Sequence, residues 1–430
     1  MKIYDNIAVA APNIMLPNKN IDLYKWAVIA CDQYTSEPEY WDDVKNEVGE
    51  NPSTLKITLP EVFLGIENEE QHNARLASIK KNIETYMSDN IWEELPDGFI
   101  VLDRATSLHP SRKGLMIAVD LEQYSYEVGN KERIRATEGT VISRIPPRVK
   151  IRANSPVELP HIMLLIDDPE GLVIESAWEK AVSANMTPCY DTKLHGKSGA
   201  IKGFFIENDS DIAKNIIDGF NKILEKSADG MLFAVGDGNH SLASAKAHWE
   251  NVKATLTDDE LKKTHPARFA LAEVVNIHDK GLDFEPIHRV VFGVKLEELM
   301  DEMKKRIGEE NVLFGEDIKE DGQKIILTDG AKKVTATVTK PLHTLAVGTI
   351  QNVIDAMIKD NSSIEVDYIH GEDSVMKLSN ENNTGVILPD ISKNAFFKTI
   401  ETDGVFPRKT FSMGEAFEKR FYLETKKITL

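Results

Sequence analysis

The spacing of apolar and polar residues alternates between two periodicities along the chain, which predicts a mixed α/β protein. Short apolar runs bounded by polar residues or glycine predict buried strands, and apolar residues repeated every three to four positions predict covering helices. We predict strands over residues 26–30, 99–103, 115–119, 161–166, 231–235 and 269–277. We predict helices over residues 69–87, 211–226 and 242–249.

The order of elements over residues 211–277 is helix, strand, glycine-rich turn, helix and strand. This order predicts a parallel crossover within one sheet.

The pattern changes after Val294, where a smaller C-terminal α+β region is expected. A charged helix is predicted over residues 295–307, and an antiparallel strand pair around Asp329 and Gly330 over 324–328 and 333–338. A further helix is predicted over 349–359, and a helix with a closing strand over 406–430. We therefore expect two regions, 1–294 with the main α/β core and 295–430.

Composition narrows the classes of partner. The 430 residues carry a formal charge of −19, and this repels DNA, RNA and anionic lipid unless basic residues are concentrated locally. Only two cysteines occur, no run approaches the roughly 20 apolar residues of a membrane span, and the first residues do not resemble a signal peptide. We expect an acidic, cytoplasmic protein that binds neither nucleic acid nor membrane, and a homo-oligomer is compatible with the sequence.

The segment GDGNHS, residues 236–241, lies where a buried strand gives way to a helix. The first backbone N–H groups of a helix bind phosphate well, and Gly236 and Gly238 let the backbone approach a ligand. Asp237 and His240 add an acid and a titratable base, so we predict both as catalytic, with Asn239 and Ser241 at the phosphate. The alternative is a tight turn in which Asn239 or Ser241 only caps the helix.

A basic segment, residues 131–152, carries seven basic and two acidic side chains in this acidic chain. Arginine forks match phosphate oxygens, and we predict that Arg135, Arg144 and Arg148 contact an anionic ligand. The alternative is that they neutralise acidic neighbours.

Two other segments end in carboxylates. Asp32 follows the first predicted strand and is a candidate general base. Asp167 and Asp168 could hold Mg²⁺, but the sequence DDPEG favours a turn.

Several segments together resemble the domain-of-unknown-function 1015 family. They are AVGDGNHSLASA, ARFALAEVVNIHDKGLDFEPIHRVV, RATEGTVISRIPPRVKIRAN with PHIMLLIDDPEG, and the C-terminal FPRKTFSMGEAFEKRFYLE. The chain is similar to a divergent subgroup, because Asn239 and Ser241 stand where the common pattern has His and Arg. The segment WAVIACDQYTS stands in place of the usual start of the family pattern, and Asp32 corresponds to the acidic residue of that start.

The loop also resembles the phosphate loop of the ParB/sulfiredoxin-like superfamily, which includes partition proteins, sulfiredoxin and kinases of free serine. This resemblance implies a strand–loop–helix unit and a phosphorylated ligand. The expected function is phosphoryl transfer to a small metabolite, such as serine, with a nucleotide or pyrophosphate and Mg²⁺ as cofactors. The alternatives are a metal-assisted phosphohydrolase and a non-catalytic nucleotide-binding regulator.

Overall fold

The computed structural model describes residues 1–127, 129–315 and 320–430, which form two compact units. Unit 1 combines Met1–Ala136, Thr140–Leu282 and Glu415–Leu430, and unit 2 combines Thr137–Gly139 and Asp283–Gly414. Unit 2 begins before Val294 because strand β14 (Phe284–Phe292) pairs with other strands of unit 2. The last residues of the chain return to unit 1.

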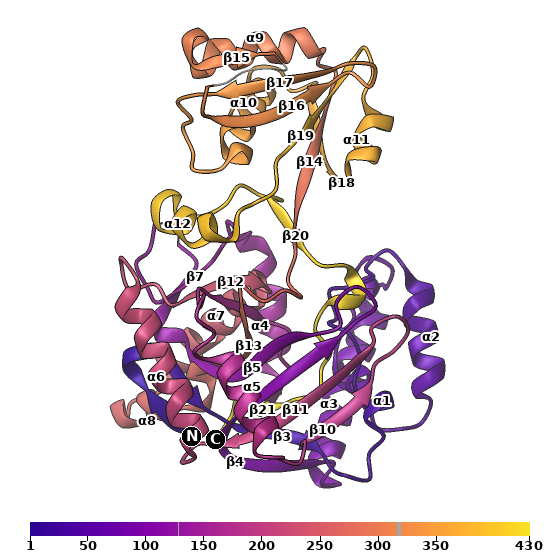
Figure 1. Ribbon diagram of the computed structural model, residues 1–430. Coiled ribbons are helices and arrows are strands. Elements are labelled where there is room, and N and C mark those ends of the chain that lie inside the picture. The colour runs from indigo at the N-terminus through magenta and orange to yellow at the C-terminus, as the bar shows by residue number, and fades with distance from the viewer. Residues whose placement is uncertain (128, 316–319) are drawn as a thin grey trace. The chain divides into compact units, whose positions relative to one another are not determined.

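Unit 1 is built on one large sheet (Figure 1). Nine of its described strands follow the order β10-β11-β4-β5-β13-β9-β12-β7-β6, and β1, β2 and β3 join at its side. Their bounds are β1 Lys2–Tyr4, β2 Val9–Ala11, β3 Asn13–Pro17, β4 Trp92–Ala105, β5 Arg112–Asp120, β6 Tyr124–Ser125, β7 Ile134–Arg135, β9 Met163–Ile166, β10 Tyr190–Lys193, β11 Ala200–Glu207, β12 Phe233–Asp237 and β13 Phe269–Asn276. A separate pair joins β8 (Val157–Glu158) to β21 (Lys426–Lys427).

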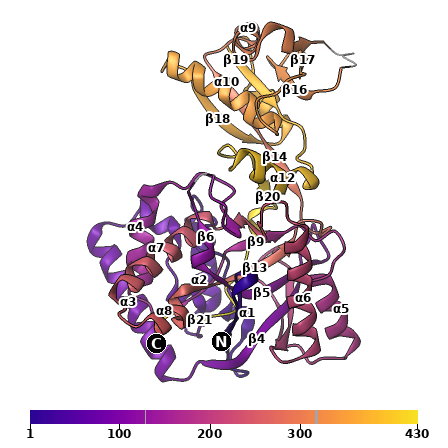
Figure 2. The same cartoon turned by 90° about the vertical axis from the view of Figure 1, so that its left-hand side faces the viewer.

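The side chains of β4 show how both faces of this sheet are buried. Phe99 and Val101 belong to a core with residues of α5, α6 and α7, whereas Ile100 and Leu102 belong to a second core with α2, α3 and the C-terminal segment. This alternation follows from the two-residue period of a strand. Figure 2 shows the paired helices α4 with α7 and α5 with α6. The helices of unit 1 are α1 Leu23–Trp26, α2 Pro38–Val48, α3 Glu69–Ser88, α4 Ile145–Ala153, α5 Ile174–Ser183, α6 Asp211–Lys226, α7 Asn239–Thr255 and α8 Asp259–Thr264.

Periodicity predicts the strands β4, β5, β9, β12 and β13 and the helices α3, α6 and α7 but not the other elements of unit 1, and the mixed α/β class is confirmed. The helix over 211–226 matches α6, where residues on one face are buried. The predicted parallel crossover is wrong, because β9 lies between β12 and β13, parallel to β13 and antiparallel to β12.

The buried run 26–30 is also not a strand. Helix α1 ends at the first residue of this run, and the only β-bridge described for the run joins Ile29 to Phe421. The run is apolar because the C-terminal segment covers it. The predicted C-terminal helix is one 3₁₀ turn, Ala416–Glu418, and residues 420–426 after it are buried and not helical.

Unit 2 has a mostly antiparallel sheet of order β15-β17-β16-β19-β14-β18, with β20 paired to β14. The predicted strand pair around Asp329 and Gly330 is confirmed as β16 and β17. The remaining bounds are β15 Val312–Phe314, β16 Gln323–Thr328, β17 Lys333–Val338, β18 Glu365–His370, β19 Asn383–Ile387, β20 Phe411–Met413, α9 Leu296–Ile307, α10 Ala346–Asp360, α11 Glu372–Leu378 and α12 Lys393–Asp403. Across the described residues, none of the helices has the length and apolar character needed to cross a membrane.

Candidate functional site

The predicted anion loop joins β12 to α7 in unit 1. Strand β12 ends at Asp237, Gly238 is the N-cap with φ of 80°, and α7 begins at Asn239. This left-handed backbone favours glycine, and a Cβ at Gly238 would lie 3.1 Å from the Cα of Ile162. Neither Asn239 nor Ser241 is the helix cap. All six loop residues are partly exposed, so a small anion can reach the start of the helix.

Ser241, in the first turn of α7, belongs to a chain of hydrogen bonds. Its Oγ lies 2.7 Å from Nε2 of His161, and Nδ1 of the same ring lies 2.9 Å from the hydroxyl of Tyr422. The backbone N–H of Cys31 donates to that hydroxyl at 3.1 Å. Burial, together with Cys31 and Asp32, raises the pKa of Tyr422 well above its usual value, so its phenol stays protonated at neutral pH.

Cys31 is not an activated nucleophile. Burial and the neighbouring Asp32 raise the pKa of its thiol to about 12. The thiolate is the reactive form of cysteine, and it is scarce at neutral pH under these conditions.

Asp237 is held by two contacts. One carboxylate oxygen accepts from the backbone N–H of Gly238 at 2.8 Å, and the other lies 3.0 Å from Nζ of Lys419. Burial acts to raise the pKa of Asp237, but Lys419, His161 and the Gly238 N–H outweigh it, and the pKa is lowered. Asp237 is therefore ionised at neutral pH and fixed in direction.

Asp32 lies near the same imidazole, with its Oδ2 4.0 Å from Nε2 of His161. The structure thus gathers three predicted residues, Asp32, Asp237 and Ser241, around His161. A lysine and a hydroxyl at a helix N-terminus can bind a phosphate. The carboxylates and the imidazole beside them can accept or donate a proton.

His240 faces another segment. The backbone N–H of Val141 donates to its Nε2 at 3.3 Å, so this nitrogen is an acceptor and Nδ1 carries the proton in the neutral ring. The loop and the start of the basic segment are therefore in contact.

The arginines of the basic segment are placed differently from one another. Arg148 on α4 is ion-paired with Glu61, whose N–H donates to the carbonyl of Cys31 at 2.7 Å, so Arg148 lies beside the segment that carries Asp32. Arg135 is buried and ion-paired with Asp229 at 2.8 Å. The side chain of Arg144 lies outside the described part of the structure. Phosphate contacts by these arginines stay predictions.

The pair Asp167 and Asp168 forms a turn, as the sequence favours. Asp168 is buried and accepts from the N–H of Val173 at 2.9 Å, and Asp167 contacts His278 at 2.6 Å. Among the residues with described placement, no group of three or more His, Cys, Asp or Glu side chains could hold a metal ion.

Sequence analysis missed His161, Lys419 and Tyr422 as site residues. His161 stands at the start of a predicted strand, and the other two lie in the C-terminal segment, which was predicted to be helical. The cluster of Lys, Arg, Phe and Tyr at residues 419–422 was the one available signal.

Comparison with known proteins places the chain in a family. A family model described as protein of unknown function (DUF1015) matches residues 14–358. The chain belongs to this family. The DUF1015 match contains the loop, Asp32 and His161 but ends before Lys419 and Tyr422. No curated protein matches the chain significantly.

Solved structures that resemble this DUF1015 protein are distant. A conserved hypothetical protein from Pyrococcus furiosus has a TM-score of 0.34 and 13% identity, covering 73% of this chain and 95% of that one. C-terminally truncated SbnI from Staphylococcus aureus has a TM-score of 0.37 and 12% identity, covering 73% and 87%. A free serine kinase variant in complex with ADP has the same score and identity, covering 73% and 92%. At these values the function has to be argued from the residues.

Proposed function

We propose that this protein transfers a phosphoryl group to the hydroxyl of a small metabolite, with free serine as the leading acceptor. The observation that carries the proposal is the gathering of Asp32, Asp237 and Ser241 around His161 at the start of α7. Phosphoryl transfer depends mostly on positioning and on neutralising charge. The helix N-terminus and Lys419 supply positive potential, and the two carboxylates can accept a proton or a metal ion.

The two acids have different roles in this proposal. Asp237 is bound to Lys419 and its pKa is lowered, and this makes it a weak base but a well-fixed ligand. In the part of the chain that the structure describes, no lysine is ion-paired with Asp32, and Asp32 takes the proton of the acceptor hydroxyl. His161 orients Ser241 and Asp32, which both lie at its Nε2, and His240 donates from Nδ1 to a phosphate oxygen.

A nucleotide or pyrophosphate is the proposed donor, bound with Mg²⁺. Mg²⁺ commonly uses one or two carboxylates together with substrate phosphates. Asp237 fits that pattern as the carboxylate ligand and leaves Asp32 as the base, and the ion would neutralise charge on the transferred group. Arg148 is proposed to leave its ion pair with Glu61 and to contact the donor phosphates when the donor binds.

The test is incubation of the full chain with serine and Mg²⁺, with ATP, ADP or pyrophosphate added in turn and followed by phosphorus NMR. The expected result is a phosphoserine resonance that grows with enzyme concentration. The reverse reaction is tested from phosphoserine and ADP. Release of inorganic phosphate without phosphoserine would instead establish a phosphohydrolase. Nucleotide binding by calorimetry without turnover would establish a regulator, and no change in any sample would overturn all three.

A further inference from the structure

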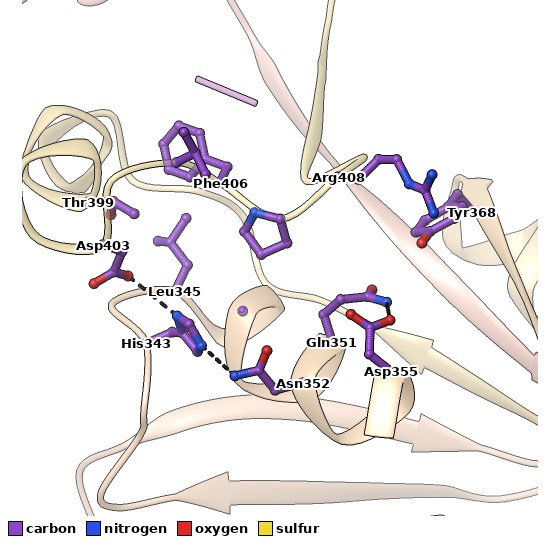
Figure 3. Close-up of a pocket in the computed structure, with 13 residues that line it drawn as sticks. His343, Leu345, Gln351, Asn352, Asp355, Tyr368, Thr399, Asp403, Phe406 and Arg408 are labelled. Atoms are coloured by element: carbon purple, nitrogen blue, oxygen red, sulfur yellow. Dashed lines mark hydrogen bonds and ion pairs between the residues drawn. The ribbon is translucent and has the colours of Figure 1, made fainter. Parts of the chain in front are cut away.

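Unit 2 contains a cavity of about 320 Å³ beside helix α10, which we call the α10 pocket. Its walls come from α10, the preceding loop, β18, α12 and the segment after α12 (Figure 3). Its volume lies at the lower end of the range of roughly 300–1,000 Å³ for small-molecule sites. A small metabolite therefore fits it better than a nucleotide.

Opposite charges line this pocket without neutralising each other. Asp355 accepts from the amide nitrogen of Gln351 at 2.8 Å, and Arg408 lies over the ring of Tyr368 at 5.9 Å from its centre. Within the described part of unit 2, neither Asp355 nor Arg408 forms an ion pair. Each can therefore bind a charged group of a ligand.

A buried arginine fixes the orientation of Asp355 (Figure 3 shows its contact with Gln351). Arg289 is fully buried and donates from Nε to Oε1 of Gln351 at 3.2 Å, and the amide nitrogen of Gln351 then faces Asp355. Its other described acceptors are the carbonyls of Ile287 and Arg408. The acid end of the pocket is thus held by a chain of hydrogen bonds that begins in the core.

The charge balance disfavours a phosphorylated ligand. Asp355 and Asp403 both line the pocket, together with the guanidinium of Arg408 and the imidazole of His343, whose Nδ1 lies 3.9 Å from Oδ2 of Asp403. Asp403 is already engaged by the N–H and hydroxyl of Thr344 at 2.8 and 3.0 Å. A phosphate would meet two carboxylates, whereas a ligand with one ammonium and one carboxylate matches Asp355 and Arg408.

Apolar side chains supply another part of the wall. Leu345, Val405, Phe406 and Pro407 line the pocket, and Phe406 is almost fully buried. Such a wall recognises an aliphatic or aromatic body by removing it from water.

We propose that the α10 pocket is a binding site for a free α-amino acid with an apolar side chain. The ammonium of the ligand binds Asp355, its carboxylate binds Arg408, and its side chain lies against Leu345 and Phe406. This site belongs to unit 2 and is independent of the phosphoryl-transfer site proposed for unit 1.

The experiment is isothermal titration calorimetry on the full chain with L-phenylalanine as first probe, followed by the other standard amino acids. Phenethylamine and 3-phenylpropionate each lack one of the two charges and should bind at least tenfold more weakly. Asp355→Asn and Arg408→Gln should each weaken binding roughly 10- to 100-fold, the loss of one charged hydrogen bond. Asp301→Asn and Lys409→Gln are matched exposed controls in unit 2 and should leave binding unchanged.

Two outcomes would overturn the proposal: no amino acid binds, or both pocket variants bind as the wild type does. Ser241→Ala, in unit 1, should retain binding. Loss of binding in that variant would move the amino acid to the loop site and also overturn the α10 assignment. Phosphorus NMR on Asp355→Asn separates the two sites, because phosphoryl transfer in unit 1 should persist in this variant while its phenylalanine binding is weakened.

Discussion

The loop site of unit 1 and the α10 pocket of unit 2 differ in how their charges are partnered. Asp237 is bound to Lys419 and Ser241 to His161, whereas Asp355 and Arg408 form no ion pair within the described residues of unit 2. Side chains fixed before a ligand arrives suit chemistry, because little reorganisation remains for the reaction step. Charges left for the ligand suit reversible binding. We therefore expect turnover in unit 1 and occupancy without turnover in unit 2.

The largest effect should follow from removing a proposed proton acceptor or donor in unit 1. Asp32→Asn, Asp237→Asn and His240→Ala should each lower phosphoserine formation by about 10²–10⁴-fold, the usual contribution of a positioned acid or base. Asp42→Asn, an exposed acid on α2, is the control and should keep full turnover. The measurement is the initial rate by phosphorus NMR, with the melting temperature confirming the fold. A folded Asp32→Asn that turns over normally would remove Asp32 as the base.

The next effect concerns the stability of unit 1 alone. Arg420 is buried and ion-paired with Glu273 and Glu424, which are also buried. Arg420→Met leaves two buried carboxylates unpaired and should lower the free energy of unfolding of unit 1 by about 3–5 kcal/mol. Chemical denaturation measures this, followed by tryptophan fluorescence for unit 1, where all five tryptophans lie, and by far-UV circular dichroism for unit 2. Arg306→Met, at a partly exposed ion pair of α9 in unit 2, should cost no more than about 1 kcal/mol. Equal losses in the two variants would contradict the burial argument.

A smaller effect is expected on the affinity of unit 1 for anions. Arg148→Ala should weaken ATP binding by about 1.5–3 kcal/mol if a charged hydrogen bond to phosphate is lost. Lys150→Ala changes an exposed cation on the same helix and is the matched control. Calorimetric titration with ATP distinguishes them. Should both variants bind ATP like the wild type, Arg148 does not contact the donor phosphates.

The smallest effect is a pH dependence in α7, the helix that carries the loop. Burial, helped by Arg152, lowers the pKa of His248 to about 4 from an ordinary value of 6.5. Between these values the unfolded chain binds a proton that the folded chain does not, so stability falls as the pH is lowered through this window. From pH 7 to pH 5 the loss should be about 1–2 kcal/mol by this linkage.

Urea unfolding at the two pH values measures this loss in the wild type and in His248→Gln. The variant should lose correspondingly less stability on acidification, whereas His370→Gln, at an exposed position in unit 2, should behave like the wild type. An identical pH dependence in His248→Gln and the wild type would show that other groups cause it.

Local patterns could be predicted from the sequence, because they depend on neighbours along the chain. The helix α6 shows this, since its apolar face and its cap Ser210 are both encoded within a few turns. The loop could also be placed between a strand and a helix, because Gly238 and the apolar run before it are adjacent.

Long-range partners could not be predicted in this way. The contacts of Asp237 with Lys419 and of His161 with Tyr422 join residues 182 and 261 positions apart. Periodicity carries no information on such pairs, and the same is true of the pairing direction of β9 with β12. The wrong prediction of a strand over residues 26–30 has a similar cause. The C-terminal segment buries this run, and a buried run has the same apolar pattern whether or not it forms a strand.

The C-terminal segment also sets an order of events during synthesis. The ribosome makes Asp283–Gly414 of unit 2 before it makes Glu415–Leu430 of unit 1. Domains of a growing chain tend to fold as units as soon as their residues are available. A nascent chain can therefore hold a finished α10 pocket while Asp237 still lacks Lys419 and His161 still lacks Tyr422. The loop site that we propose for phosphoryl transfer is complete only after those residues have emerged.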